Sequence, residues 1–166
     1  MLRRRLALAT AAALLAVPAL SSCGFNYATD RPYTPANGAN NHDADVDVLS
    51  AVIVSGQEGA GTFVASFVNP TDTAIEFTSL DPDLSQRFSA PEVTPVAVPP
   101  QGLVNLAIDG GVPIQGDFAA GNYVPLVVGF SDGTKSVLQV PVVPDDGDFA
   151  GLDISAEASP QPSPSS

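Results

Sequence analysis

One pentapeptide of the chain has the spacing of a catalytic nucleophile. Residues 129–133 read Gly-Phe-Ser-Asp-Gly, the pattern with which hydrolases place a serine on a sharp turn between a strand and a helix. That chemistry also needs a histidine and an acid after the serine. No histidine follows Ser131, and a segment rich in valine follows in place of a helix. We therefore interpret the pentapeptide as a turn between two strands.

A second candidate for chemistry surrounds the only histidine. His42 is followed by carboxylates at alternate positions, Asp43, Asp45 and Asp47, as at the start of a calcium-binding loop. Such a loop needs glycine at its sixth position and glutamate at its twelfth, and here both positions are valine. One histidine cannot dominate a transition-metal site. The pattern predicts a charged, solvated surface, with weak divalent-ion binding as the alternative.

The other carboxylates are not spaced for acid–base catalysis. Asp81 and Asp83 flank a proline, and Asp145, Asp146 and Asp148 form a short acidic run. General acid–base chemistry needs two carboxyl groups in different environments across a cleft, which neither group suggests. We expect a chain that is not an enzyme and that has no cofactor and no metal site.

The single cysteine closes an export signal. Arg3 to Arg5 precede an apolar stretch, Leu6 to Leu20, that is too short to span a membrane as a helix. The following Leu20-Ser21-Ser22-Cys23 resembles the bacterial lipobox. That resemblance implies that the Cys23 thiol carries diacylglycerol and that the signal, residues 1–22, is removed. A plain signal peptide is the alternative, but it would leave a lone thiol in an oxidising compartment.

Removal of the signal would leave a strongly acidic protein. All 18 acidic residues follow Cys23, together with three basic residues, so the net charge would be −15. This charge repels phosphate backbones, so we expect no nucleic-acid partner. The lipid must then supply the membrane affinity. We expect the protein on the outer face of the cytoplasmic membrane, in the cell envelope, where another envelope protein is a candidate partner.

Composition divides the mature chain into three parts. Residues 23–45 are rich in Asn, Asp and Pro without an apolar period, which predicts a flexible, lipidated tether. Residues 46–144 carry the apolar stretches of a folded domain. Residues 145–166 are first acidic and then rich in Ser and Pro, which predicts a disordered tail. The alternative is that the apolar residues of this tail dock on the domain: Phe149, Leu152 and Ile154.

The domain alternates apolar segments with turn residues, and it lacks an apolar period typical of helices. Asp132-Gly133 predicts a hairpin, and Pro95 places its segment at a sheet edge. The expected strands are 46–54, 62–68, 74–78, 92–98, 103–108, 122–130 and 135–143. They predict an all-β, immunoglobulin-like or cupredoxin-like two-sheet sandwich of about seven or eight strands, with a small closed barrel as the alternative. The expected core is Phe63, Phe67, Phe77, Leu106, Leu126, Val128, Phe130, Leu138 and Val140.

Four segments of the domain also have the pattern of a known family: Val46–Val54, Gly61–Asn69 entering an Asn-Pro turn, Val93–Gly102, and Val127–Val142. Together they resemble the periplasmic copper chaperones of the PCuAC type and their actinobacterial lipoprotein relatives. The resemblance implies a cupredoxin-like β-sandwich and a copper site of histidines and methionines, which are ligands suited to Cu(I). Between Leu80 and Ile114, where these ligands should fall, the chain has neither residue type.

The sequence thus supports two classes of function. The first is a membrane-anchored, non-catalytic binding or interaction module whose ligand the sequence does not specify. The second is a metal-handling, copper-related accessory protein that has kept the scaffold of the copper chaperones. A hydrolase built on Ser131 is the weakest reading, because the histidine it requires is missing from the positions that follow.

Overall fold

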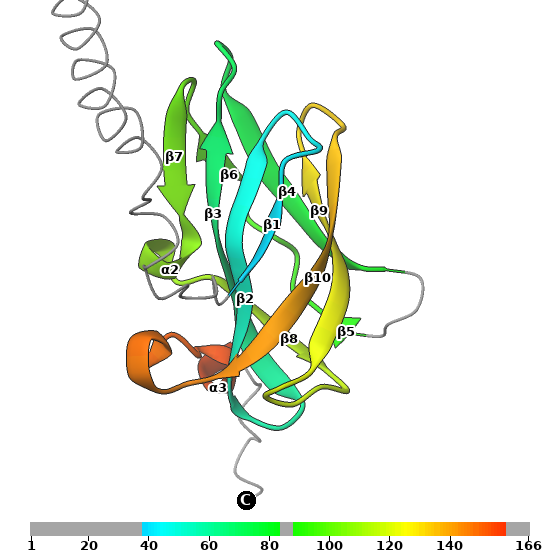
Figure 1. Ribbon diagram of the computed structural model, residues 1–166, viewed down its shortest axis with the longest axis vertical. Helices are drawn as coiled ribbons and strands as arrows, with labels where there is room; N and C mark the ends of the chain where they lie inside the picture. The colour runs from blue at the N-terminus through cyan, green and yellow to red at the C-terminus, as the bar shows by residue number, and fades with distance from the viewer. Residues whose placement is uncertain (1–37, 84–87, 159–166) are drawn as a thin grey trace, which may run out of the picture. The chain divides into compact units, whose positions relative to one another are not determined.

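Strands build most of the structure, a computed structural model that describes residues 38–83 and 88–158 (Figure 1). Within these residues there are ten strands: β1 (Ala39–Asn41), β2 (Asp47–Gln57), β3 (Ala60–Asn69), β4 (Ile75–Pro82), β5 (Phe88–Ser89), β6 (Val96–Val98), β7 (Gly102–Asn105), β8 (Val112–Gly116), β9 (Tyr123–Phe130) and β10 (Lys135–Pro144). Three short helices complete the described part: α2 (Leu106–Asp109), η2 (Gly147–Phe149) and α3 (Ser155–Ala158). None of the described helices is long and apolar enough to cross a membrane.

The strands form two layers that share one pairing. The first layer has the order β5-β8-β3-β2, with β7 also paired to β3 and β1 to β2. The second has the order β10-β9-β4-β6. The end of β10 runs parallel to β2, with Val142 opposite Ile53, and this pairing curls one layer over the other. The prediction of an all-β, two-sheet sandwich is confirmed, with more strands than expected because β1, β5 and β8 were not foreseen.

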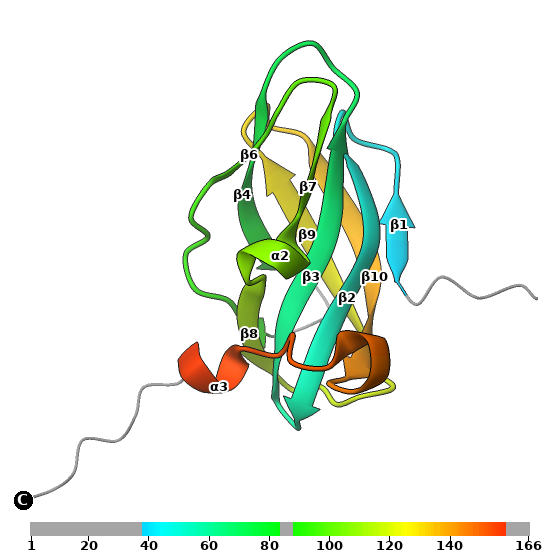
Figure 2. The ribbon, with the colours of Figure 1, turned by 90° about the vertical axis from the view of Figure 1, so that its left-hand side faces the viewer.

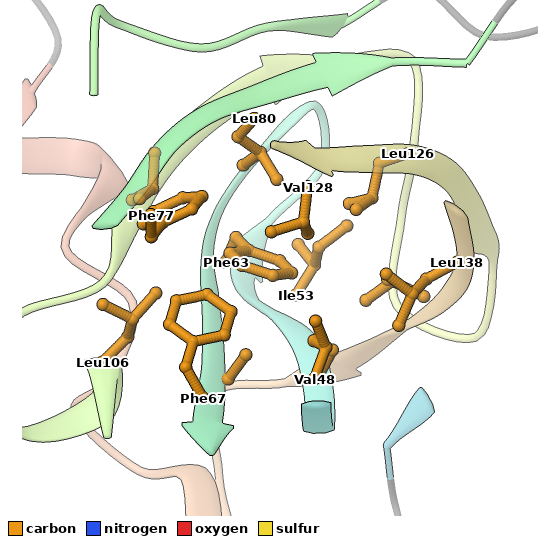
Figure 3. Packing of buried hydrophobic residues seen from close by; sticks show 14 of the residues in the cluster. Val48, Ile53, Phe63, Phe67, Phe77, Leu80, Leu106, Leu126, Val128 and Leu138 are labelled. Carbon is orange, nitrogen blue, oxygen red and sulfur yellow. The ribbon is translucent and has the colours of Figure 1, made fainter. Parts of the chain in front are cut away.

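The core between the layers follows the alternation of the sequence. All nine residues expected to form it are buried. Phe67 of β3 packs against two other rings of the core, with its ring centroid 4.9 Å from that of Phe77 and 5.6 Å from that of Phe130. Figure 3 shows Phe67 and Phe77 among labelled aliphatic neighbours such as Leu126, which converge from both layers. Because successive strand residues point to opposite faces, the period of two seen in the sequence is sufficient to select this face.

The predicted hairpin between β9 and β10 is also confirmed. Gly133 has φ +87°, a left-handed conformation that glycine adopts without strain. The amide of Phe130 donates to the carbonyl of Thr134, which closes the turn. The Asp132 carboxylate accepts from the amide and the hydroxyl of Thr134. The turn chemistry therefore sets the register of the last two strands.

The segment 103–108, expected as one strand, is half strand and half helix. Strand β7 ends at Asn105, whose side chain accepts a hydrogen bond from the amide of Ala107 and so caps the first turn of α2. Gly110 at φ +96° ends the helix after one turn. The Asn cap and the left-handed glycine outweigh the strand-like alternation of the apolar residues. The segment after α2, which lies outside the expected strands, forms β8 beside β3.

The folded unit begins earlier than the predicted boundary at residue 46. Strand β1 lies within the segment expected as tether and pairs with β2. The Asn40 side chain accepts from the amide of Ser50 at 2.7 Å. Gly38 lies against the backbone of Ser50, where a Cβ atom would approach to 2.5 Å. The polar composition of β1 gave no signal for a strand. Hydrogen bonds of backbone and side-chain amide groups hold β1 in place. The earlier part of the predicted tether lies outside the described residues.

The prediction of a disordered tail is wrong for residues 145–158, which we call the strap. The strap crosses the outer face of β2 and β3 (Figure 2). On that face Val52, Val54 and Val64 are buried in a second apolar cluster, to which the strap contributes Phe149 and Leu152. The docking that the sequence left as an alternative therefore occurs, because these three valines point away from the main core and need a cover. The remaining residues of the predicted tail are outside the described ranges.

Candidate functional site

A pocket of about 300 Å³ lies beside α2, and we call it the α2 pocket. It is formed where the segment that precedes β6 passes α2 and the start of β8. Its apolar lining comes from four separate parts of the chain: Phe77, Val93, Val96, Leu106 and Val112. The remainder of its lining consists of polar residues, prolines and a glycine: Pro91, Glu92, Thr94, Asp109, Gly111 and Pro113. Phe77, Leu106 and Val112 are buried and form its floor.

Local geometry holds α2 close to the sheet at this pocket. The amide of Gly111 donates to the carbonyl of Leu106 at 2.8 Å and closes the helix. Gly111 has φ +68° and lies against β3, where a Cβ atom would be 2.8 Å from the carbonyl oxygen of Phe63. Only glycine satisfies both the conformation and the close approach. The position of Leu106 in the pocket floor thus depends on Asn105 before the helix and on the glycines after it.

The rim of the α2 pocket is negative. Glu92 and Asp109 are both exposed there. No hydrogen bond or ion pair reaches either carboxylate from the residues that the structure describes. Lys135, at the start of β10, is the one lysine or arginine in the described ranges. The two rim carboxylates are therefore solvated charges with no cation assigned to them within this part of the chain.

The described lining of the pocket does not bring a nucleophile together with a base. Thr94 supplies the one hydroxyl among its described lining residues, and that lining includes no histidine, cysteine or serine. A threonine needs an adjacent base to become a nucleophile. Glu92 and Asp109 are exposed and without hydrogen-bond donors in the described structure, so nothing places them in the contrasting environments that acid–base catalysis requires.

The candidate metal ligands near the N-terminus do not form a ligand set. The Nδ1 atom of His42 is 3.0 Å from the Asp47 carboxylate, and the histidine side chain is 64% exposed. Asp43 instead exchanges hydrogen bonds with Asn41. Among the described residues there is no group of three or more His, Cys, Asp or Glu side chains arranged to hold a metal ion. The alternate spacing of these carboxylates therefore does not bring them around one point.

Ser131 has a structural role in the hairpin. Its hydroxyl accepts from the amide of Glu76 at 2.9 Å, and its own amide donates to the carbonyl of Glu76 at 2.8 Å. These two bonds connect the β9–β10 turn to the start of β4. The segment is a turn between strands, as predicted, and the strand-to-helix elbow of a hydrolase is not formed here.

The acidic residues of the predicted tail are partly structural. Asp145 accepts from the amides of Gly151 and Leu152 and so folds the strap on itself. Asp153 fastens the strap to the sheet: it accepts from the Gly56 amide at 2.7 Å, from the Thr62 hydroxyl at 3.1 Å and from the Ser155 amide at 2.9 Å. Partial burial by itself would raise the pKa of Asp153, but the hydrogen bonds from Ser155, Gly56 and Thr62 outweigh burial and hold this pKa below its ordinary value.

The sequence did not predict the α2 pocket or the role of Asp153. The Asn105 cap and the pair Gly110-Gly111 were available as signals for a short helix, and that helix forms one wall of the pocket. The convergence of the pocket segments had no local signal. Of the other residues singled out in the sequence, Asp81 is exposed on β4, and Cys23 lies outside the described residues.

The two layers form a β-sandwich, and this sandwich is similar in fold to PCuAC domains. Neither a protein-family model nor a curated protein matches the chain. Among solved structures, the apo PCuAC domain from PmoF1 is similar with a TM-score of 0.52 and 16% identity, over 63% of this chain and 98% of that one. The copper-bound PCuAC domain from PmoF2 is similar with a TM-score of 0.51 and 13% identity, over 63% and 97%. The predicted likeness in fold is confirmed.

The donor atoms of this chain do not fit the copper site that the family resemblance implies. The sequence has one methionine, one cysteine and one histidine: Met1, Cys23 and His42. None of them lies in the strands that build the two layers from β2 to β10. A Cu(I) site of soft ligands therefore has no donors in this scaffold. The fold is shared with a copper-bound domain, whereas the ligand set is not.

Proposed function

We propose that the chain is a non-catalytic binding module of the cell envelope, anchored to the outer face of the cytoplasmic membrane through lipid on Cys23. The observation that carries this proposal is the α2 pocket, which combines an apolar floor with a charged rim and has no histidine, cysteine or serine in its described lining. Apolar pockets with a few polar groups at defined positions are typical of small-molecule sites. The rim charge would set which ligands enter.

A binding screen on the unlipidated chain from Gly24 onward tests this proposal. A mixture of small organic molecules is added to isotope-labelled protein, and amide chemical shifts are followed by NMR. We expect ligands that shift the amides of Val93, Leu106 and Val112 together. Val93→Trp, which places an indole in the pocket, should abolish these shifts. Val137→Trp is the matched control, because Val137 is exposed on β10 and is not part of the pocket lining. A screen without any pocket ligand would contradict the proposal.

The anchor has its own test. The Cys23→Ser variant is expected to leave the membrane fraction and to appear in the medium or wall fraction, since stable retention needs more than one acyl chain and the variant has no thiol to carry the two chains of diacylglycerol. Mass spectrometry of the wild-type protein from membranes should show a diacylglycerol-modified Cys23 at the new N-terminus. An unmodified thiol on the membrane-bound protein would contradict the proposed anchoring. Pocket binding is independent of that result, because it is measured on the chain without lipid.

A second candidate function is copper handling, which the structural neighbours favour because one of them is a copper-bound PCuAC domain. In this chain such a role would have to use carboxylates, with His42 beside Asp47, because the domain has no soft ligands. Calorimetry with Cu(I), Cu(II), Zn(II) and Ca(II) distinguishes the two functions. Submillimolar copper binding that is lost in His42→Gln would support copper handling. Without such binding, the pocket remains the candidate site.

A further inference from the structure

We propose that the α2 pocket binds a small organic cation, with an ammonium or guanidinium group at Glu92 and Asp109 and an aliphatic body on the apolar floor. This inference rests on the proposed function and specifies its ligand class. It is drawn from three properties of the pocket: the state of its carboxylates, the chemistry of its floor, and the charge of the surrounding protein.

The rim carboxylates differ from the structural carboxylates elsewhere in the fold. Asp145 and Asp153 accept hydrogen bonds that hold the strap in place. Glu92 and Asp109 accept none from the described residues, although both line the same pocket. Two carboxylates at one opening provide acceptors for the several N–H donors of an ammonium or guanidinium group. They repel an anion from the same place.

The floor excludes a bare metal ion as the best occupant. Phe77, Leu106 and Val112 are buried beneath the opening and offer no oxygen, nitrogen or sulfur from their side chains. A hard cation such as Ca²⁺ takes six or more oxygen ligands, whereas the described lining has two carboxylates, both at its rim. An aliphatic chain, in contrast, gains by leaving water for such a floor. The pocket therefore matches a molecule with one charged end and one apolar end.

The charge of the whole protein favours the same ligand class. Mature net charge would be −15, and Lys135 is the single lysine or arginine in the described ranges. A field of one sign concentrates ions of the opposite sign near the surface and accelerates their binding. The field acts on the charge of a ligand and not on its shape. The apolar floor would select the uncharged part of the ligand.

Three probes with the same six-carbon body test the inference: hexylammonium, hexanol and hexanoate. Each is titrated into the labelled chain from Gly24 onward, and the amide shifts of Val93, Leu106 and Val112 are fitted. We expect hexylammonium to bind about tenfold more tightly than hexanol, and hexanoate to give no saturable shift in the pocket. The affinity for hexylammonium should fall with added salt, because the rim is exposed.

Matched variants separate the rim from the general charge. Glu92→Gln with Asp109→Asn should weaken hexylammonium binding about fivefold or more and leave hexanol unchanged. Glu58→Gln with Asp148→Asn removes the same total charge at exposed positions outside the pocket lining. That control pair should change the affinity for hexylammonium less than twofold, because salt screens charges that are distant from the pocket. Circular dichroism and thermal unfolding confirm that both variants fold.

Each other outcome is informative. If hexanol or hexanoate binds the pocket as well as hexylammonium, the cation inference is wrong, whereas a pocket that binds small molecules remains. If the control pair weakens hexylammonium as much as the rim pair does, the carboxylates of Glu92 and Asp109 are not the recognition groups, and the inference is overturned. If none of the three probes shifts the pocket amides, the inference is also overturned. The open screen with the Val93→Trp variant then decides the proposed function separately.

Discussion

The strap and the α2 pocket both involve apolar residues and carboxylates, but the two regions use them in opposite ways. In the strap, Phe149 and Leu152 cover the valines of β2 and β3, and Asp153 receives three hydrogen bonds that hold this cover down. At the pocket, apolar residues form the floor of an open hollow, and the rim carboxylates of Glu92 and Asp109 receive no hydrogen bond from the described residues.

This difference indicates which carboxylates serve the fold. A charge that several donors satisfy contributes to stability, and its removal leaves those donors without a partner. A solvated charge with no protein partner contributes little to stability. Such a carboxylate can therefore serve ligand binding without a cost to the fold. The two regions should therefore respond differently to mutation, and four substitutions or deletions test that expectation in order of decreasing effect on stability.

The largest effect is expected from removing the strap by ending the chain after Pro144. Val52, Val54 and Val64 would then be exposed on the outer face of β2 and β3. At about 1.5 kcal/mol for each of the three valines, the free energy of unfolding should fall by about 4.5 kcal/mol. Urea denaturation followed by circular dichroism measures this change. Ending the chain after Ala158, which keeps the whole strap, is the control. A strap deletion as stable as this control would remove the structural half of the comparison.

A smaller loss is expected from Gly111→Ala in the wall of the α2 pocket. The left-handed backbone and the Cβ atom at 2.8 Å from the Phe63 carbonyl oxygen both oppose alanine. We expect the free energy of unfolding to fall by about 2–3 kcal/mol, from backbone strain together with overpacking. Gly133→Ala is the control: φ is +87° there, and nothing lies within 4 Å of the added Cβ. Equal losses at both sites would show that the wall is not closely packed on β3.

Asp153→Asn tests the fastening of the strap. Asparagine keeps one acceptor oxygen, but its NH₂ group would take the place of the oxygen that now accepts from the Gly56 amide at 2.7 Å. Two donors would then face each other, and this hydrogen bond would be lost. Because Asp153 is half-buried, we expect a loss of about 1–2 kcal/mol at neutral pH. Asp148→Asn, an exposed carboxylate in the same strap, should change stability by less than about 0.5 kcal/mol. A similar loss from both variants would point to net charge, and not to these hydrogen bonds.

The pH dependence of the same variant follows from the lowered pKa of Asp153. A folded-state pKa below the ordinary value of 3.8 means that the charged form is favoured by folding. Its contribution is complete above the unfolded-state pKa and is lost as the pH falls through the folded-state pKa. The stability difference between wild type and Asp153→Asn should thus be constant near neutral pH and shrink below about pH 4. A difference that grows as the pH falls would contradict the assignment.

What the sequence could predict depends on how local each signal is. The alternation that buries Phe63, Phe67 and Phe77 is contained within single strands, and the Asp132-Gly133 turn within a few residues, so both were predictable. Asp153 was not, because its partner Gly56 is 97 positions away in the chain. The polar composition around Asp153 is also typical of disorder, and the reason for the strap to fold lies in the valines of β2 and β3 that it covers.

The α2 pocket was unpredictable for a related reason. Its floor joins residues of β4, α2 and β8, and no short window of sequence contains all three. The lining also includes the segment 91–94 before β6, for which the sequence indicated a single strand interrupted by proline. In the structure only Val96–Val98 is strand, because Pro91 and Pro95 cannot donate to a ladder. The proline-rich part is therefore free of the sheet and able to form the pocket rim.

The smallest change in stability is expected from the double variant of Glu92→Gln and Asp109→Asn. Neither carboxylate accepts a hydrogen bond from the described residues, and both are exposed. The free energy of unfolding should change by less than about 0.5 kcal/mol, and a small gain is expected because two charges are removed from an acidic surface. The matched comparison is Asp145→Asn with Asp153→Asn, which removes the same charge from the strap and breaks bonds to Gly56, Gly151 and Leu152. If the rim pair lowered the free energy of unfolding as much as the strap pair, Glu92 and Asp109 would be structural groups. The proposed difference between the strap and the α2 pocket would then be wrong.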